Sequence, residues 1–198
     1  MAKNLKKTFL KEALNMLPIY GWNAELIINV EDQLGYHNIF TTIKDLVAYH
    51  LEQNDLKMLK KLANAKEPEK VRDKIKLALL TKITLNDAAI LKETVKFLTK
   101  PQNTNLAFKS LANSCDKIWI YAGDKSADFN YYTKRTLLAG IYSATIVYYI
   151  KNSEQDTLNE QDLELFISKR IDEILKLGSF KTKIIDETTN LFKKFKPN

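Results

Sequence analysis

Apolar residues recur every three or four positions along almost the whole chain, and this spacing constrains the fold more than any other feature. Near the start, for example, Leu5, Phe9 and Ala13 follow one another at steps of four, which places them on one face of an α-helix. No segment alternates apolar and polar residues with the clean period of two that a half-buried strand requires. Gly and Pro number only 5 and 4 among 198 residues, which suits long helices joined by short connections. The sequence therefore predicts an all-α fold.

Capping and helix-breaking residues divide this pattern into segments. Pro18 and Gly21 predict the end of a first helix, Asn23 the N-cap of a second, Gly35 its end, and Asn86 the N-cap of a later helix. We expect helices over about 3–17, 23–35, 36–42, 43–64, 67–81, 86–99, 103–121, 126–150 and 158–177, with a last one after residue 178.

The first four predicted helices have the layout of a helix-turn-helix motif, which could bind DNA or could be part of a plain helical bundle. The third of them, "YHNIFTT" (36–42), would read the bases. It offers only His37 and Asn38, with Lys44 beyond its end, and this is a poor set for contacting bases and phosphates. The net charge of +7 leaves a transcriptional regulator open as the alternative function, although we expect no nucleic acid as a partner. The expected division is a helix-turn-helix-like region at 1–50, a helical domain at 51–177 and a C-terminal amphipathic helix at 178–198.

Several chemical classes lack support in the sequence. The single cysteine, Cys115, excludes an internal disulfide and lies in an apolar helical register, so we expect a buried thiol. His37 and His50 have no metal-ligand spacing, and no Gly-rich phosphate loop follows a strand. The acidic stretch at 124–135 imitates a calcium loop but lacks Gly at its sixth position and Glu at its twelfth. We therefore expect no metal, no cofactor and no enzymatic activity.

The same stretch is better explained as the start of a helix. Ser126 is a good N-cap, and Asp128 in the first turn would interact favourably with the helix dipole. Tyr131 and Tyr132 follow, and because neighbouring residues of a helix point about 100° apart, at least one of the two should face outward. Exposed aromatic side chains beside Arg135 are typical of a protein-binding surface, whereas packing of both tyrosines on neighbouring helices is the alternative.

After this start comes an uncharged run, "TLLAGIYSATIVYYI" (136–150), which is shorter than a typical membrane span. A helix that is apolar on most sides is buried among others. It could form solid core, or it could line a cavity for an apolar ligand.

The segment "DKIWIYAGDKSADFNYYTKR" resembles the signature of the ubiquinone biosynthesis accessory protein family, the ninth of the Coq proteins. That signature runs approximately D-x-x-W-x-x-A-G-D-x-S-T-D-x-N-W-Y-T-K-R. The chain departs from it at Ala127, where Thr is usual, and at Tyr131, where Trp is usual. "LPIYGWNAE" and "LTKPQNTNLAFKSL" resemble earlier segments of the family. The matching residues are Asp116, Trp119, Ala122, Gly123, Asp124, Ser126, Asp128, Asn130, Tyr132, Thr133, Lys134 and Arg135.

The resemblance implies a TetR-family-like fold with a vestigial DNA-binding half and a second half that binds isoprenoid lipids. It also implies assistance to a di-iron hydroxylase through a surface that includes the aromatic pair. Carried onto this chain, the expected partner-binding residues are Asp128, Tyr131, Tyr132 and Arg135. The expected lipid-binding residues are Leu111, Cys115, Trp119, Leu138, Ile141, Tyr142, Thr145 and Ile146.

The C-terminal segment "SFKTKIIDETTNLFKKFKPN" combines an apolar stripe with flanking lysines. A basic amphipathic helix at a chain end is typical of a membrane-surface helix, and docking on the protein's own body or on a dimer mate is the alternative. The expected membrane-binding residues are Phe180, Ile184, Leu191, Phe192 and Phe195.

Together these observations predict a non-enzymatic, homodimeric accessory protein of ubiquinone biosynthesis. It would bind an isoprenoid quinone or phospholipid and present it to a hydroxylase at a membrane surface. The first residues have neither the apolar core of a signal peptide nor the composition of a transit peptide. We therefore expect a cytoplasmic bacterial protein on the inner membrane, or the matrix side of the mitochondrial inner membrane in a eukaryote.

Overall fold

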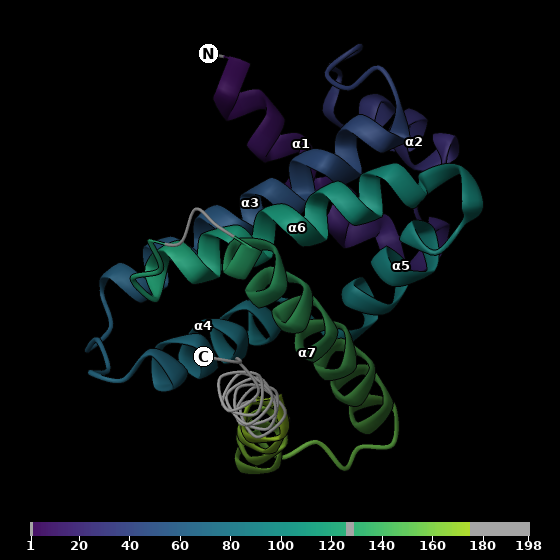
Figure 1. Cartoon of the computed structure of the whole chain (residues 1–198). Helices are drawn as coiled ribbons and strands as arrows, with labels where there is room; N and C mark the ends of the chain where they lie inside the picture. Colours follow the sequence, from purple (N-terminus) through teal and green to yellow (C-terminus); the bar gives the residue numbers. More distant parts are fainter. Residues whose placement is uncertain (1, 126–128, 175–198) are drawn as a thin grey trace, which may run out of the picture.

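The computed structural model of the chain describes residues 2–125 and 129–174, and all regular structure in these ranges is helical, which confirms the all-α prediction. Figure 1 shows α3 and α6 lying side by side across the molecule, with α7 crossing below them. The elements are α1 (Ala2–Tyr20), α2 (Ala24–Leu34), α3 (Ile43–Ala63), α4 (Val71–Thr84), α5 (Ala88–Leu98), the 3-10 helix η1 (Pro101–Asn103), α6 (Thr104–Tyr121), α7 (Phe129–Glu154) and the helical residues 160–174.

Predicted capping signals are confirmed at both ends of α2. The Asn23 side chain accepts a hydrogen bond from the backbone N–H of Leu26 at 3.0 Å, and Gly35 ends the helix with φ +68°. α1 extends beyond its predicted end at residue 17, because Pro18 lies inside the helix and the chain turns at Gly21, whose φ is +67°. A proline in the last helical turn gives up only one backbone hydrogen bond, so the helix continues through it.

The predicted third helix at 36–42 is wrong, because these residues are not helical. Asn38 has φ +60°, and its N–H donates to the Glu31 carboxylate at 2.7 Å instead of to a helical carbonyl. Thr42 and Asp45 then form a capping box that starts α3, so these polar side chains bond to the backbone of the next helix. The helix that would read DNA bases in a helix-turn-helix motif is therefore absent from the described residues.

The predicted start of α5 was also misplaced by one residue. Asp87 is the N-cap and accepts from the Ala89 N–H at 2.8 Å, whereas Asn86 is buried and accepts a hydrogen bond from Asn54 at 2.7 Å. The helix predicted over 67–81 runs instead from Val71 to Thr84.

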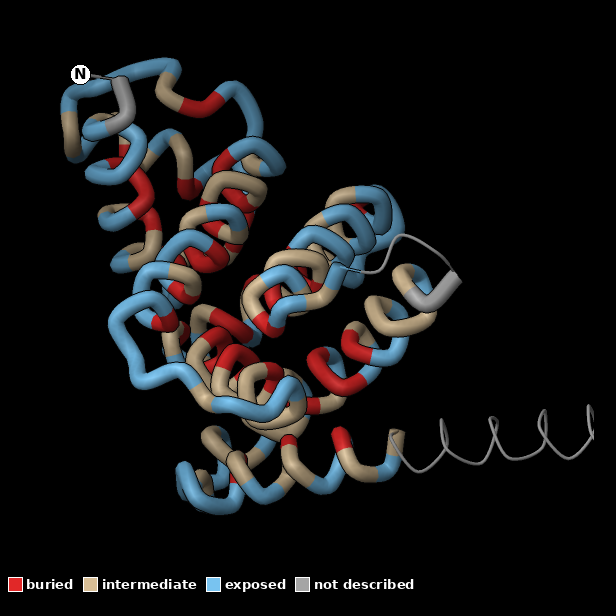
Figure 2. The backbone as a smooth tube through the Cα atoms, turned by 60° about the vertical axis from the view of Figure 1, so that its left-hand side comes forward, coloured by how far each residue is buried: buried red, intermediate tan, exposed pale blue. Residues whose placement is uncertain are grey.

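Two groups of buried apolar side chains form the interior, and Figure 2 shows the buried residues on the inward sides of the helices. The N-terminal cluster joins α1, α2, the start of α3 and Phe97 of α5. The C-terminal cluster joins the end of α3 with α4, α6, α7 and residues 160–174. The division of the chain at residues 50 and 177 stays a prediction.

Buried polar side chains on α3 separate the two clusters. Leu46 and Val47 belong to the N-terminal cluster and Met58 to the C-terminal cluster, and the buried residues between them include Asn54 and Asp55. Together with the polar side chains that they contact on other elements, these residues form what we call the polar layer. It comprises His50, Asn54, Asp55, Lys82, Asn86, Ser114 and Lys117.

Asp55 connects three helices within the polar layer. Its carboxylate accepts hydrogen bonds from Ser114 Oγ at 2.8 Å and Lys117 Nζ at 2.7 Å, both on α6, and from Lys82 Nζ on α4. Burial alone would raise the pKa of Asp55, but the charge of Lys82 and the hydrogen bonds from Lys117, Lys82 and Ser114 together lower it. Burial lowers the pKa of Lys82 and the charge of Lys117 lowers it further, while the charge and hydrogen bond of Asp55 act in the opposite direction.

Candidate functional site

The signature residues meet where α6 ends and α7 begins, and Arg135 of α7 lies at the centre of this junction. Its Nε and Nη2 each lie 2.7 Å from Oδ1 of Asp116 on α6, and its Nη1 lies 3.1 Å from Oδ2 of Asp124, just after α6. The pair between Arg135 and Asp124 is largely shielded from solvent, since the two side chains are 11% and 4% exposed. Burial alone would lower the pKa of Arg135, but its hydrogen bonds to Asp116 and Asp124 raise it. The guanidinium therefore stays charged and joins the two helices.

Backbone geometry brings these acids within reach of Arg135. After α6 the chain turns at Gly123, whose φ of +88° suits a residue without a side chain. The Asp124 N–H then donates back to the Trp119 carbonyl at 3.0 Å, which closes the helix end. Lys134 Nζ lies 2.6 Å from Asp124, and the Trp119 indole donates to the Lys134 carbonyl at 3.1 Å. We call Asp116, Asp124, Tyr131, Lys134 and Arg135 the junction cluster.

The two adjacent tyrosines have different environments. The guanidinium of Arg135 lies 3.4 Å from the centre of the Tyr131 ring, and the Tyr131 hydroxyl donates to Asp116 at 3.1 Å. Tyr132 is 70% exposed and contacts the Tyr131 ring edge-on. The prediction that at least one tyrosine faces outward is confirmed. The arrangement makes Tyr131 part of the junction cluster and leaves Tyr132 accessible to another molecule.

The junction cluster includes residues that sequence reasoning quoted in the signature but did not assign to the site. Asp116 and Asp124 hold Arg135, so they belong with it. Their place in the signature was the only signal for them, because nothing local shows that residues 11 and 19 positions before Arg135 would contact it. Asp128, the other predicted partner-binding residue, lies outside the described residues.

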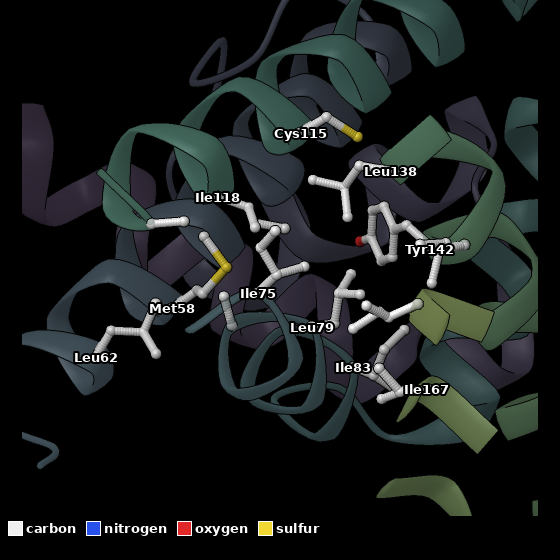
Figure 3. Close-up of a cluster of buried hydrophobic side chains, with 14 of the residues drawn as sticks. Met58, Leu62, Ile75, Leu79, Ile83, Cys115, Ile118, Leu138, Tyr142 and Ile167 are labelled. Atoms are coloured by element: carbon white, nitrogen blue, oxygen red, sulfur yellow. The ribbon is translucent and has the colours of Figure 1, made fainter. Parts of the chain in front are cut away.

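All eight predicted lipid-binding residues come together on the inward faces of α6 and α7. Cys115, Leu138, Ile141, Tyr142 and Thr145 are buried. The other three, Leu111, Trp119 and Ile146, are partly buried and pack against the C-terminal cluster. Figure 3 shows Cys115, Leu138 and Tyr142 converging with side chains of α3 and α4.

The chemistry of this interior is apolar and unreactive. Burial raises the pKa of the Cys115 thiol to about 12, with Asp55 contributing, so the buried thiol predicted from the sequence is confirmed. A depression of about 450 Å³ lies on the surface instead, and residues of the α3–α4 connection line it: Lys66, Glu67, Pro68, Glu69, Lys70 and Asp73 of α4. Lipid binding within this apolar interior stays a prediction.

The described part of the chain offers neither a metal-binding cluster nor a helix that could span a membrane. Within residues 2–125 and 129–174, no group of three or more His, Cys, Asp and Glu side chains could hold a metal ion. Across the same ranges, each helix is too short or too polar to cross a bilayer. The predicted membrane-binding residues, from Phe180 to Phe195, lie outside the described residues.

Comparison with known proteins finds a family that resembles this part of the chain. The COQ9 family model matches residues 104–178, which include α6, the junction cluster and α7. Over these residues the chain is similar to the COQ9 family. The signature resemblance noted in the sequence is thereby confirmed.

Proteins of several organisms show the same similarity over most of the chain. The chain is 27% identical over 202 residues to a probable mitochondrial ubiquinone biosynthesis protein coq9 of Dictyostelium discoideum, covering 94% of this chain and 64% of that protein. It is 26% identical over 193 residues to the mitochondrial ubiquinone biosynthesis protein COQ9 of Homo sapiens, covering 89% and 59%. The corresponding protein of Schizosaccharomyces pombe is 23% identical over 188 residues, with 91% and 74% covered. The chain thus spans about three fifths of the length of the first two relatives.

Proposed function

We propose that this protein is a lipid-binding accessory protein of ubiquinone biosynthesis. It binds a prenylated quinone intermediate and presents it to a membrane-associated di-iron hydroxylase, so that catalysis belongs to the partner. The match of residues 104–178 to the COQ9 family model, and the names of similar proteins as ubiquinone biosynthesis proteins, support this pathway.

The observation that carries the proposal is the exposed Tyr132 beside the ion-paired junction cluster. An aromatic side chain held on a rigid support loses little conformational entropy on binding, which is why such residues dominate the affinity of protein interfaces. The outer face of α7 continues from Tyr132 through four exposed, uncharged residues, Thr136, Gly140, Ser143 and Val147. A helix of the hydroxylase could approach this face closely, because a side chain at Gly140 would meet open space.

The apolar side chains of α6 and α7 are the proposed place for the isoprenoid tail. The uncharged residues 136–150 and the buried members of the C-terminal cluster offer the apolar surface that a prenyl chain requires. The basic apolar segment at 178–198 would rest on an anionic membrane, as its lysines and its apolar stripe suggest. The inner membrane of a bacterium, or the matrix side of the mitochondrial inner membrane, is the proposed location, and a homodimer is the proposed assembly.

Replacement of Tyr132 tests the partner surface. We expect Tyr132→Ala to weaken binding to a di-iron hydroxylase of ubiquinone biosynthesis by about tenfold or more, the loss typical of a central aromatic residue. Calorimetric titration would measure this. Ile28→Ala is a matched control, because Ile28 is 57% exposed but lies on α2 in the other half of the chain. Equal affinities for the wild type and Tyr132→Ala would refute the proposed surface.

Lipid binding is tested separately by native mass spectrometry of the purified full chain. Co-purified isoprenoid lipid, or a complex with added prenylated quinone, is the expected result. Absence of both would refute lipid binding.

The alternative function, a TetR-type transcriptional regulator, rests on the net charge of +7 and the order of the first helices. The non-helical residues 36–42 disfavour it, because they would have to provide the base-reading helix. A gel shift with sequence preference and steep salt dependence would support the regulator instead.

A further inference from the structure

The connection between α3 and α4, residues 64–70, carries a surplus of positive charge at one end of the molecule. Figure 1 shows it at the left-hand edge, beside the start of α4. Residues 60–74 hold six basic and three acidic side chains, so this short stretch accounts for +3 of the net charge of +7. Such a local surplus attracts negatively charged surfaces. The exposed lysines of the stretch are Lys60, Lys61, Lys66 and Lys70.

Most of the acidic side chains of this stretch are already paired. Glu67 forms an ion pair with Lys74 at 2.5 Å, and Asp73 lies 3.7 Å from Arg72. Within the described ranges, the four exposed lysines take part in no ion pair, and neither does Glu69. The groups available to another molecule are therefore four ammoniums and one carboxylate.

The surface depression of about 450 Å³ lies at this connection. Both Lys66 and Lys70 line it, and so does Glu69. The other charged side chains of the lining, Glu67 and Asp73, are the ones that Lys74 and Arg72 neutralise. Lysine binds phosphate groups as a point charge. Two unpaired ammoniums around one hollow therefore suit a phosphate group.

Aliphatic side chains are exposed beside these lysines. Val71, which follows Lys70 at the start of α4, is 50% exposed. Leu56, one helical turn before Lys60, is 45% exposed. Lysines next to exposed aliphatic residues are typical of surfaces that lie at the boundary between lipid headgroups and acyl chains. A nucleic acid would leave these aliphatic side chains without an apolar partner, so the combination favours a lipid surface.

The last described residues of the chain lie next to the same surface. Nη1 of Arg72, in the first turn of α4, is 2.9 Å from Oδ1 of Asp172. This ion pair places the end of the helical residues 160–174 beside the start of α4. The segment 178–198 begins six residues after Asp172, and six residues of extended chain span about 20 Å at most. If that segment rests on a membrane, the α3–α4 connection is therefore held close to the same membrane.

We propose that the α3–α4 connection is a second membrane contact, in which Lys66 and Lys70 bind the phosphate of an anionic phospholipid and Val71 lies among the headgroups. This proposal rests on the membrane contact of 178–198 proposed above and adds a site on the folded body. One contact at the end of the chain does not define how the body faces the bilayer, whereas two contacts do. The pair of contacts would turn α4 toward the bilayer.

Vesicle flotation with the full chain tests this contact. The vesicles contain either phosphatidylcholine alone or equal parts of phosphatidylcholine and phosphatidylglycerol. The double variant Lys66→Gln/Lys70→Gln removes the two proposed phosphate ligands. The matched control is Lys7→Gln/Lys11→Gln, because both of these lysines are exposed but lie on α1 in the other half of the chain. Circular dichroism checks that each variant keeps the unfolding temperature of the wild type.

We expect Lys66→Gln/Lys70→Gln to bind the anionic vesicles about ten- to thirtyfold more weakly than the wild type, the loss typical of two lysines at an anionic surface. The control variant should lose less than about threefold, since charges farther from the membrane than a Debye length are screened. Glu69→Gln should bind at least as tightly as the wild type, because it removes the unpaired carboxylate. Binding to phosphatidylcholine alone should be the same in all variants.

Tryptophan emission gives a second readout, of position. Val71→Trp should show a shift of its emission to shorter wavelength on anionic vesicles, beyond any shift of the wild type. Ile28→Trp is the matched control, because Ile28 is 57% exposed on α2, and its emission should not shift. Equal shifts in the two variants would contradict the proposed orientation.

Three results would overturn the second contact while leaving the contact of 178–198 intact. One is wild-type affinity of Lys66→Gln/Lys70→Gln for the anionic vesicles. Another is an equal loss in the control variant, which would mean that net charge acts without a site. The third is unchanged vesicle binding with a loss of binding to duplex DNA, which would assign the lysines to nucleic acid. If the wild type binds neither vesicle, the proposed membrane contact itself fails, and this inference fails with it.

Discussion

Replacing Asp55 with asparagine tests the role of the polar layer most directly. Asp55 is 3% exposed and shares its carboxylate between Lys82 on α4 and Lys117 on α6. Asn keeps nearly the same shape but removes the negative charge. The variant would therefore leave the Lys82 ammonium, which is 2% exposed, without a counter-ion.

The expected loss follows from this burial. Removing one partner of a buried ion pair costs about 3–5 kcal/mol, because the other charge stays desolvated and unpaired. Loss of the ion pair with Lys117 adds little to this cost, since the Lys117 side chain is 30% exposed and water can solvate it. A domain of ordinary stability has about 5–15 kcal/mol in total, so the variant should fold but be markedly weakened. With a urea dependence of about 2 kcal/mol per molar, the midpoint should fall by about 1.5–2.5 M.

Urea unfolding at pH 7, followed by circular dichroism, measures this loss. Lys82→Met is the matched control, because it removes the buried ammonium while Lys117 and Ser114 still pair with Asp55. We expect it to change the stability by less than about 1.5 kcal/mol, and the double variant should recover part of the loss of Asp55→Asn. A loss below about 1 kcal/mol in Asp55→Asn would refute the reasoning.

The pH dependence gives the same test a second readout. The pKa of Asp55 is lower in the folded state than its ordinary value of about 3.9. Its contribution is therefore fully present above about pH 4 and is lost as the pH falls through the lowered value. The difference between wild type and Asp55→Asn should stay constant from pH 5 to 8 and shrink only below pH 4.

Three further predictions follow from single groups. Arg135→Lys should destabilise the fold by about 1.5–3 kcal/mol and weaken hydroxylase binding. The reason is that one ammonium cannot contact both Asp116 and Asp124 as the guanidinium does. Unchanged urea unfolding would contradict this prediction. Burial and the charges of Lys82 and Lys57 lower the pKa of His50 to about 3 in the folded chain. Below pH 6.5, the ordinary pKa of histidine, the unfolded chain therefore binds more protons than the folded chain, and the stability should fall from pH 6.5 toward pH 3. His50→Gln should reduce this slope in urea titrations. Cys115, whose thiol has a pKa of about 12, should react with a thiol reagent at pH 8 only after denaturation, and rapid native labelling would contradict its burial.

Much of the fold could be predicted from local patterns. The apolar spacing identified the helices, and Asn23 and Gly35 marked the ends of α2, because caps act through bonds to backbone groups only a few residues away. Helix geometry also predicted an outward-facing tyrosine on α7, whereas the predicted N-cap Ser126 lies outside the described residues. Local signals fail where two similar residues compete, as at Asn86 and Asp87, since tertiary contacts with Asn54 decide which of them caps α5.

The errors and omissions have the same physical origin. Residues 36–42 are all weak helix formers, and Thr42 and Asp45 stabilise the next helix through a capping box. Asp55 could not be singled out, because Lys82 and Lys117 lie 27 and 62 positions away on other helices. Contacts between distant charged residues depend on how the helices pack, and no local spacing encodes them.

The polar layer also limits how α3 can align with α4. Apolar surfaces tolerate a shift of one helical turn at modest cost, since one methyl group can replace another. Asn54 contacts Asn86 through a directed hydrogen bond, and Asp55 needs Lys82 beside it. An alignment shifted by one turn would leave the Asn54 amide and the Asp55 charge unpaired in the interior. The surrounding aliphatic residues can therefore be substituted by one another without loss of the unique alignment of α3 with α4, as long as Asn54, Asp55, Lys82 and Asn86 are kept.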